Sequence, residues 1–395
     1  MNEHAPRPLK GIRVIDLSRL APGPYATMLL ADMGAEVITV GAGGDAGVAP
    51  VFARGKTLIR LDLKQEAGRR ALHRLVETAD VLMEGFRPGV AARIGAGYAE
   101  LSALNPRLVY CSLTGYGQDG PRAQEAGHDI NYLAASGVLG AVGPAGAPPQ
   151  VPLNLVADFA GGSLFAVAGI LAALVARQST GRGRQVDAAM MDGCLSMMGM
   201  HADMWGTDFM PARGQGLLDG GAPFYRCYAC AEGGHMAVGA LEPAFFANLW
   251  HVLGFDDPVP YHMEPDLWPE LEARLTKAFA TRTRDEWAAV FDGAEACVTP
   301  VLRPDEIAAD AQARHRLGNA PTTVPLAPKF DGDSAPFPTL NMADRTHEVL
   351  TQAGLSPTDI ANLVEANAQA KTRSLEWPPK RARTAKAASD RGVRT

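Results

Sequence analysis

The chain has 395 residues and a formal net charge of −6, with 47% apolar and 20% charged residues. This acidic, ordinarily globular composition disfavours bulk binding to nucleic acid or to a membrane surface, and we expect neither as a partner. Five scattered cysteines do not form a disulfide framework, and no run of about 18 uncharged apolar residues occurs, so we expect a cytoplasmic protein without a spanning helix.

Strands and helices alternate along the first half of the chain. Apolar runs predict strands at residues 12–17, 36–40, 58–63, 80–83 and 108–113, and helices at 24–33 and 65–78. Pro24 suits the first turn of its helix because its fixed backbone angle matches helical geometry. The order predicts an α/β fold with right-handed βαβ units and a mostly parallel, doubly wound sheet.

The second half of the chain has a different sequence pattern. It contains a mainly helical stretch, a glycine-rich loop, a hairpin at 225–239, and helices at 243–253, 268–280 and 284–291. We therefore expect a large domain at 1–205, a linker at 206–224, a small domain at 225–320, a linker at 321–345, a return to the large domain at 346–370, and a basic disordered tail at 371–395.

Three segments carry side chains suited to proton transfer. His128 and Asp129 stand where a helix begins and where backbone N–H groups are free. Asp158 opens an apolar helix, and Glu242 precedes Pro243 at the start of another. Each also has an ordinary explanation, because a histidine near a cap, an aspartate N-cap and a glutamate at a helix N-terminus are favourable without chemistry.

Basic residues suited to a phosphate-bearing ligand lie near predicted strand ends, where open parallel sheets bind ligands: Arg54, Lys56, Lys64, Arg87 and Arg93. A single surface lysine or arginine is usually only solvated, so each of these residues alone is weak evidence for a phosphate site.

Sulfur-bearing residues form two further groups. Six methionines lie between positions 190 and 204, and a methionine-rich core explains them more readily than a flexible surface for acyl chains. Cys227 and Cys230 form a lone C-x-x-C without a second pair at zinc spacing, so we expect structural cysteines and no metal.

Taken together, the segments 127–132, 154–162 and 239–243 resemble the α-methylacyl-CoA racemases of the family III CoA-transferase superfamily. Similar stretches recur from about residue 9 to about residue 365. The resemblance implies the family III fold, in which a large Rossmann-like parallel-sheet domain accompanies a smaller α+β domain and two chains interlock as a homodimer with a shared active site.

The resemblance also implies residue roles. His128 and Asp158 would be the two acid/base residues, with Glu242 of the partner chain supporting His128. The acyl-CoA thioester site would be lined by Leu61, Asp62, Leu63, Lys64, Gly127, His128, Asp129, Ile130, Asn131 and Tyr132, with Arg87 and Arg93 near the CoA phosphates.

The residue types suit the implied chemistry. Racemising a 2-methylacyl-CoA requires a base on each face of the α-carbon and no cofactor, since CoA is part of the substrate. We expect the backbone amide of Asp129, more than its carboxylate, to serve the thioester oxygen.

One departure and two alternatives remain open. The family commonly has an arginine in or just after the second strand, whereas residues 37–43 contain none, so Arg54 becomes a candidate substitute. The chain is alternatively a CoA-transferase with Asp158 as nucleophile, or a catalytically silent CoA-binding relative. His128 and Glu242 favour the racemase, because transfer does not call for a second base.

Overall fold

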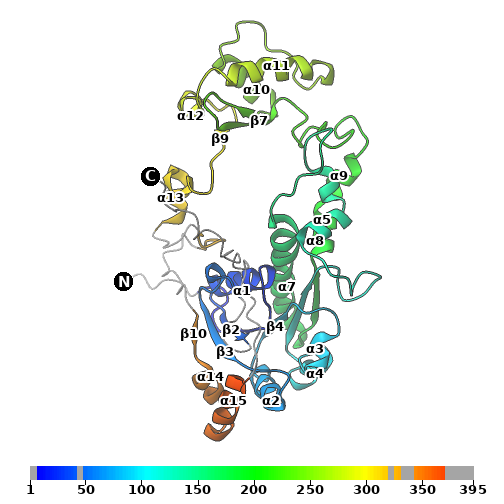
Figure 1. Cartoon of the computed structure of the whole chain (residues 1–395), viewed down its shortest axis with the longest axis vertical. Coiled ribbons are helices and arrows are strands. Elements are labelled where there is room, and N and C mark those ends of the chain that lie inside the picture. Colours follow the sequence, from blue (N-terminus) through cyan, green and yellow to red (C-terminus); the bar gives the residue numbers. More distant parts are fainter. Residues whose placement is uncertain (1–6, 42–47, 319–323, 331–341, 370–395) are drawn as a thin grey trace, which may run out of the picture. The chain divides into compact units, whose positions relative to one another are not determined.

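The computed structural model describes residues 7–41, 48–318, 324–330 and 342–369 (Figure 1). Contacts divide the chain into two compact units. Unit 1 comprises Met1–Gln124, Gly162–Ala189 and Ala327–Thr395, and unit 2 comprises Glu125–Gly161 and Met190–Leu326. Residues 125–161 and 190–205, which the sequence analysis assigned to the large domain, are thus grouped with unit 2. The expected tail at 371–395 lies outside the described residues.

Unit 1 is built on a parallel sheet. Among the described residues, seven strands pair in the order β10-β3-β2-β1-β4-β5-β6, and every pairing is parallel. Their bounds are β1 Arg13–Asp16, β2 Glu36–Gly41, β3 Lys56–Arg60, β4 Val81–Glu84, β5 Val109–Thr114, β6 Gln185–Ala189 and β10 Ala343–Asp344. The strand order reverses between β1 and β4, and such a switch point opens a crevice at the strands' carboxyl ends. The predicted parallel α/β sheet is therefore confirmed.

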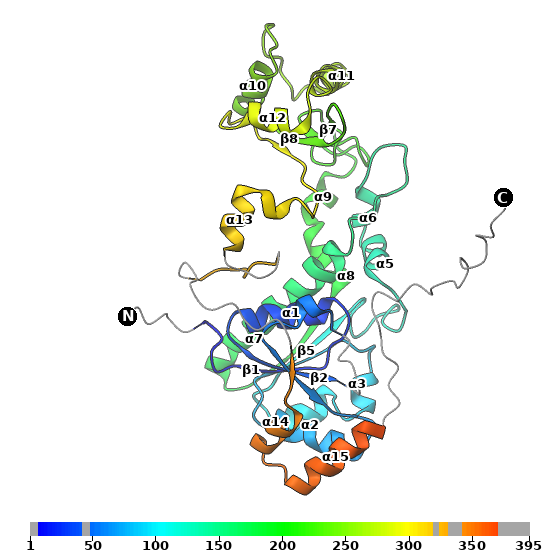
Figure 2. The same ribbon diagram turned by 60° about the vertical axis from the view of Figure 1, so that its left-hand side comes forward.

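Helices cover both faces of this sheet, as a doubly wound fold requires (Figure 2). Helices α1 (Pro22–Asp32) and α7 (Phe165–Thr180) contact each other on one face. The other face carries α2 (Glu66–Val76), α4 (Tyr98–Leu104), α14 (Thr346–Gln352) and α15 (Pro357–Gln369), with the short α3 (Val90–Arg93) before α4. The apolar core on that face joins the first strands to the C-terminal helices through residues such as Ile38, Leu72 and Leu350.

Helix α7 continues a preceding π-helix, η2 (Leu155–Leu164). Among the described residues, this continuous Leu155–Thr180 segment is the single helix that meets the length and hydropathy expected of a membrane span, with 44% of its most apolar window buried. Core helices of soluble folds meet the same criterion, and α7 packs against β5 and β6. The feature is therefore weak support for a membrane span.

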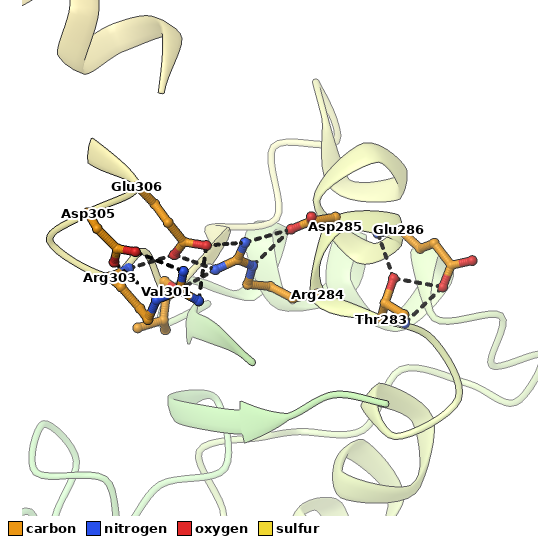
Figure 3. Close-up of polar contacts among 8 residues, drawn as sticks. All are labelled: Thr283, Arg284, Asp285, Glu286, Val301, Arg303, Asp305 and Glu306. Carbon is orange, nitrogen blue, oxygen red and sulfur yellow. Dashed lines mark hydrogen bonds and ion pairs between the residues drawn. The ribbon is translucent and has the colours of Figure 1, made fainter. Parts of the chain in front are cut away.

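Unit 2 contains an antiparallel sheet, β7 (Tyr225–Ala229), β8 (His235–Gly239) and β9 (Val298–Pro300). Helices α10 (Pro243–Val252), α11 (Trp268–Phe279) and α12 (Arg284–Phe291) pack on an aromatic core that includes Phe224, Trp250 and Phe279. Arg284 at the start of α12 forms two hydrogen bonds with Glu306, of 2.8 and 2.9 Å, and so fastens the helix to the segment beyond β9 (Figure 3).

The other helices and strands described in unit 2 are all helical elements. They comprise α5 (Asp129–Ala135), α6 (Val138–Ala141), the first part of η2, α8 (Met190–Met197), α9 (Gly199–Met204) and α13 (Ala311–Leu317). Short 3₁₀ turns occur at η1 (Pro50–Phe52), η3 (Pro265–Leu267) and η4 (Ile307–Ala309). Helix α5 packs against α6 and α8, which places the Gly127–Tyr132 hexapeptide in a helical setting.

Candidate active site

The hexapeptide at residues 127–132 forms a braced helix start. His128 is the N-cap residue of α5, as the sequence predicted, and its side chain is exposed. The His128 N–H donates to Oδ1 of Asn131 at 3.0 Å, and the Tyr132 hydroxyl donates to the Gly127 carbonyl at 2.6 Å. Asn131 and Tyr132 therefore fix the backbone on both sides of His128.

The Asp129 side chain points away from this exposed face. It is buried, and its Oδ2 accepts hydrogen bonds from the backbone N–H groups of Ala157 and Asp158, both at 2.9 Å. Burial raises the pKa of the Asp129 carboxyl, although these two hydrogen bonds oppose the rise. The carboxylate therefore has a structural contact to the second candidate base, which the sequence analysis, concentrating on the backbone amide, did not anticipate.

Asp158 lies within the π-helix η2 and not at its cap. Its half-buried side chain accepts a hydrogen bond from Nδ2 of Asn154 at 3.0 Å. Burial raises the pKa of the Asp158 carboxyl; the Asn154 hydrogen bond and the charge of His128 oppose this rise, and the charge of Asp129 adds to it. His128 and Asp158 thus lie close enough to influence each other electrostatically.

The backbone around Asp158 is unusual in two ways. A π-helix has i→i+5 hydrogen bonds, is rare, and recurs at functional sites. Gly161 on η2 and Gly193 on α8 are in backbone contact, since a Cβ on Gly193 would lie 2.0 Å from the Gly161 carbonyl oxygen. The two glycines allow α8 to approach the turn that carries Asp158.

Glu242 is the N-cap residue of α10, at the place predicted from Pro243, and it is exposed. The residues before it are held in place, because the Gly239 N–H donates to the Cys297 carbonyl at 2.9 Å and Nε2 of buried His262 donates to the Leu241 carbonyl at 2.9 Å. Within the described part of this single chain, Glu242 forms no ion pair with His128. Its support of His128 from a partner chain remains a prediction.

The expected CoA-binding residues of unit 1 follow β3 and β4 at the carboxyl edge of the sheet, on the loops after these strands and, for Arg93, at the end of α3. Leu61 is buried, Asp62 and Leu63 are half-buried, and Lys64, Arg87 and Arg93 are exposed. The buried Glu84 carboxylate accepts a hydrogen bond from the Phe86 N–H at 2.7 Å and so shapes the loop that carries Arg87. Three cations are therefore available at a ligand-binding edge of the sheet.

Two other candidate cations are structural. Arg54 is buried and pairs with Asp32, through Nε–Oδ1 at 2.9 Å and Nη2–Oδ2 at 2.5 Å. Lys56 is buried too, with its Nζ 2.6 Å from the Thr27 hydroxyl and 2.8 Å from the Pro24 carbonyl. The suggestion that Arg54 substitutes for the missing CoA contact is therefore wrong; residues 42–47, which follow β2, lie outside the described part of the chain.

An apolar cavity of about 420 Å³ lies within unit 2. Its lining is rich in methionine and aliphatic side chains, namely Val138, Ala141, Val142, Gly143, Val156, Met197, Met198, His201, Met204, Phe209, Met210, Leu218 and Asp219. Of the six methionines between 190 and 204, only Met190 is buried. The preferred interpretation of these methionines as core is therefore wrong for most of them, and several line a space that an apolar ligand can occupy.

Comparison with known proteins agrees with this arrangement. The sequence model of CoA-transferase family III matches residues 9–325. The chain belongs to CoA-transferase family III. It is 42% identical over 374 residues to a human protein named alpha-methylacyl-CoA racemase, covering 90% of this chain and 96% of the human one. It is 31% identical over 330 residues to the mouse succinyl-CoA:glutarate CoA-transferase, covering 78% of this chain and 75% of that protein.

A solved structure of the family shares the fold. The crystal structure of a CaiB/BaiF family protein from Brucella suis superimposes with a TM-score of 0.73 at 25% identity, over 89% of this chain and all of the other. Family III membership accounts for the large parallel sheet. It does not by itself choose between racemase and transferase, because proteins with both names are among the relatives.

Two polar groups of this family III site were missed from the sequence. Asn154 was inside a quoted motif without a role, although its spacing of four residues from Asp158 is a helical contact distance. The Asp129 carboxylate reaches a segment 29 residues away, a pairing that local sequence does not reveal. Among the described residues, no group of three or more His, Cys, Asp or Glu side chains is arranged to hold a metal ion.

Proposed function

We propose that this chain is an α-methylacyl-CoA racemase, an isomerase that interconverts (2R)- and (2S)-2-methylacyl-CoA thioesters. The observation that carries the proposal is that Asp129, the residue next to the exposed His128, accepts a hydrogen bond from the N–H of the half-buried Asp158 at 2.9 Å, which brings the two candidate bases to neighbouring helix starts. The similarity to the human and mouse racemases, at 42% and 41% identity, supports the same choice.

In the proposed mechanism one of the two side chains removes the α-proton and the other returns a proton to the opposite face. The electron pair of the broken C–H bond forms an enolate with the thioester carbonyl, and the return of a proton restores the thioester. Burial raises the pKa of Asp158, which improves this carboxylate as a base. The N–H of Asp129, in the first turn of α5, is a donor suited to the developing enolate oxygen.

We assign the CoA phosphates and the acyl chain of the substrate to different surfaces of the chain. Lys64, Arg87 and Arg93 supply positive charge for the CoA phosphates. The apolar cavity in unit 2 has a volume suited to an acyl chain, and methionine side chains adapt to differently shaped apolar groups. The reaction consists of proton transfers only, so it requires no cofactor.

A homodimer forms part of the proposal. Helix α7 and the end of η2 expose apolar side chains, including Leu164, Phe165 and Val175, at 48%, 40% and 72% exposure. Exposed apolar side chains of this kind are typical of a surface that another chain covers. In an interlocked dimer, Glu242 of a second copy would be free to approach His128.

A CoA-transferase is the second candidate, because the chain is also similar to named CoA-transferases and Asp158 is a possible nucleophile. The neighbouring His128 favours proton transfer, since a nucleophilic carboxylate needs no second base.

Solvent exchange separates the two functions. The full-length protein incubated with a 2-methylacyl-CoA in deuterium oxide should incorporate deuterium at the α-carbon, measured by mass spectrometry. His128→Ala and Asp158→Ala should each lower interconversion by at least about a hundredfold, the usual contribution of a general base. His235→Ala and Asp256→Ala, at exposed positions elsewhere in unit 2, serve as controls. CoA transfer to an added carboxylate without exchange would overturn the racemase proposal.

A further inference from the structure

Asp129 links the two proposed bases through its position in the chain and its hydrogen bonds. It directly follows His128, and it is only 6% exposed. Its Oδ2 accepts from the N–H groups of Ala157 and of Asp158 itself, both at 2.9 Å. Those N–H groups belong to the first turn of η2, where a helix has no internal acceptors for them. The carboxylate thus caps the helix that carries the second base.

The other oxygen of this carboxylate has no such partner. Among the described residues, Asp129 Oδ1 is buried without a hydrogen bond. Leaving a buried polar atom without a hydrogen bond is unfavourable. The buried Cys194 thiol of α8 also interacts electrostatically with Asp129. The two backbone N–H dipoles at the start of η2 point at the Asp129 carboxylate and favour its charged form.

We propose, on the assumption that the racemase function is correct, that Asp129 is a positioning residue for Asp158, holding its backbone through two N–H groups while keeping a negative charge beside its carboxylate. A capping serine or asparagine would provide the hydrogen bonds alone. An aspartate adds a charge that opposes ionisation of Asp158. One side chain thereby places the base and adjusts how strongly it binds a proton.

The direction of the charge effect distinguishes this positioning role from a purely structural role of Asp129. Asp129→Asn keeps the size of the side chain and an oxygen that can accept both N–H groups, but removes the charge. The pKa of the Asp158 carboxyl should then fall, because a nearby like charge disfavours ionisation. The measurement is a pH titration of the full chain labelled with ¹³Cγ-aspartate and followed by NMR, with Asp158→Asn identifying the resonance.

The pH dependence of catalysis should shift in the same direction as the pKa of Asp158. In Asp129→Asn, the limb of the pH–rate profile that belongs to Asp158 should move to lower pH, and kcat should fall while KM for the acyl-CoA stays within about twofold. Asp129→Glu should restore the position of that limb. Asp310→Asn is the matched control, since Asp310 also caps a helix, accepting from the Ala313 N–H at 2.7 Å, on α13. It should leave the Asp158 titration unchanged.

The outcomes separate this inference from the proposed function. If the wild-type protein does not exchange the α-proton, the racemase function fails, whereas the NMR titration still decides whether Asp129 influences Asp158. If Asp129→Asn is folded by circular dichroism and the Asp158 titration and the pH–rate profile match those of wild type, the positioning role is overturned. A shifted Asp158 titration together with a shifted limb of the pH–rate profile supports both the racemase function and the positioning role of Asp129.

Discussion

Asn154 donates a hydrogen bond from its Nδ2 to Oδ2 of Asp158, 3.0 Å away and four residues further along the chain. The residue before it, Leu153, adopts a left-handed backbone with φ of 57°, a conformation that non-glycine residues seldom adopt. Such strain is kept where the surroundings over-determine it, often at functional sites. The strained turn thus directly precedes the amide that reaches the Asp158 carboxylate.

Removing this amide should have the opposite effect to removing the Asp129 charge. The hydrogen bond from Asn154 lowers the pKa of Asp158, so Asn154→Ala should raise it and move the Asp158 limb of the pH–rate profile to higher pH. We expect kcat/KM below that limb to fall about tenfold, in keeping with the loss of a hydrogen bond to a charged group. The measurement is α-proton exchange as a function of pH.

Asn248→Ala is the control, because Asn248 donates to a backbone carbonyl, that of Glu295, in another part of unit 2. A profile for Asn154→Ala that shifts downward, or does not shift, would contradict the assignment of the Asn154 amide as a donor to ionised Asp158.

The contact between Gly161 and Gly193 predicts a stability effect. In Gly193→Ala the new methyl would lie 2.0 Å from the Gly161 carbonyl oxygen, so η2 and α8 must separate. Overpacking of this kind costs about 1–3 kcal/mol, and we expect a lower Tm by circular dichroism. Gly199→Ala, at the start of α9, meets no atom within 4 Å and should keep or slightly raise Tm. Equal Tm values for the two variants would argue against close packing of these helices.

The cavity predicts a chain-length effect on substrate choice. Ala141 is buried and lines the cavity, so Ala141→Leu should reduce the space by three carbon atoms. We expect kcat/KM for a long-chain 2-methylacyl-CoA to fall about tenfold, the effect of a few methylenes in an apolar pocket, while a short-chain substrate is little affected. Ala202→Leu, on the exposed side of α9, is the control. Equal losses for long and short chains would place the acyl group elsewhere.

Local patterns predicted those parts of the fold and site that local sequence determines. The buried strands, the N-cap position of His128 and the placement of Glu242 before Pro243 follow from hydrophobic runs and helix-start signals. Strand β6 was missed because Gln185–Ala189 is an edge strand that buries only its last two residues, so its sequence lacks an apolar run.

The remaining discrepancies depend on long-range packing. Arg54 looks like a surface cation in sequence, and only the fold shows that Asp32 lies beside it in the interior. Helical spacing of methionines indicates an apolar face, but not whether that face meets other side chains or lines a cavity. The reach of Asp129 to Asp158 likewise depends on α5 and η2 being neighbours, which no local pattern encodes.

The ion pair between Arg284 and Glu306 predicts how stability depends on pH (Figure 3). The Arg284 side chain, followed by the Arg303 backbone N–H, lowers the pKa of Glu306 from 4.5 to about 2. A carboxyl whose pKa is depressed in the folded state stabilises that state above the unfolded pKa, and this contribution disappears as pH falls from about 4.5 to about 2. Glu306→Gln should therefore be less stable than wild type at neutral pH and converge with it near pH 2, measured by urea unfolding across this range.

Glu264→Gln, at an exposed position of the same unit, should show no such convergence. A wild-type advantage over Glu306→Gln that is independent of pH would show that the pair contributes through packing and not through charge.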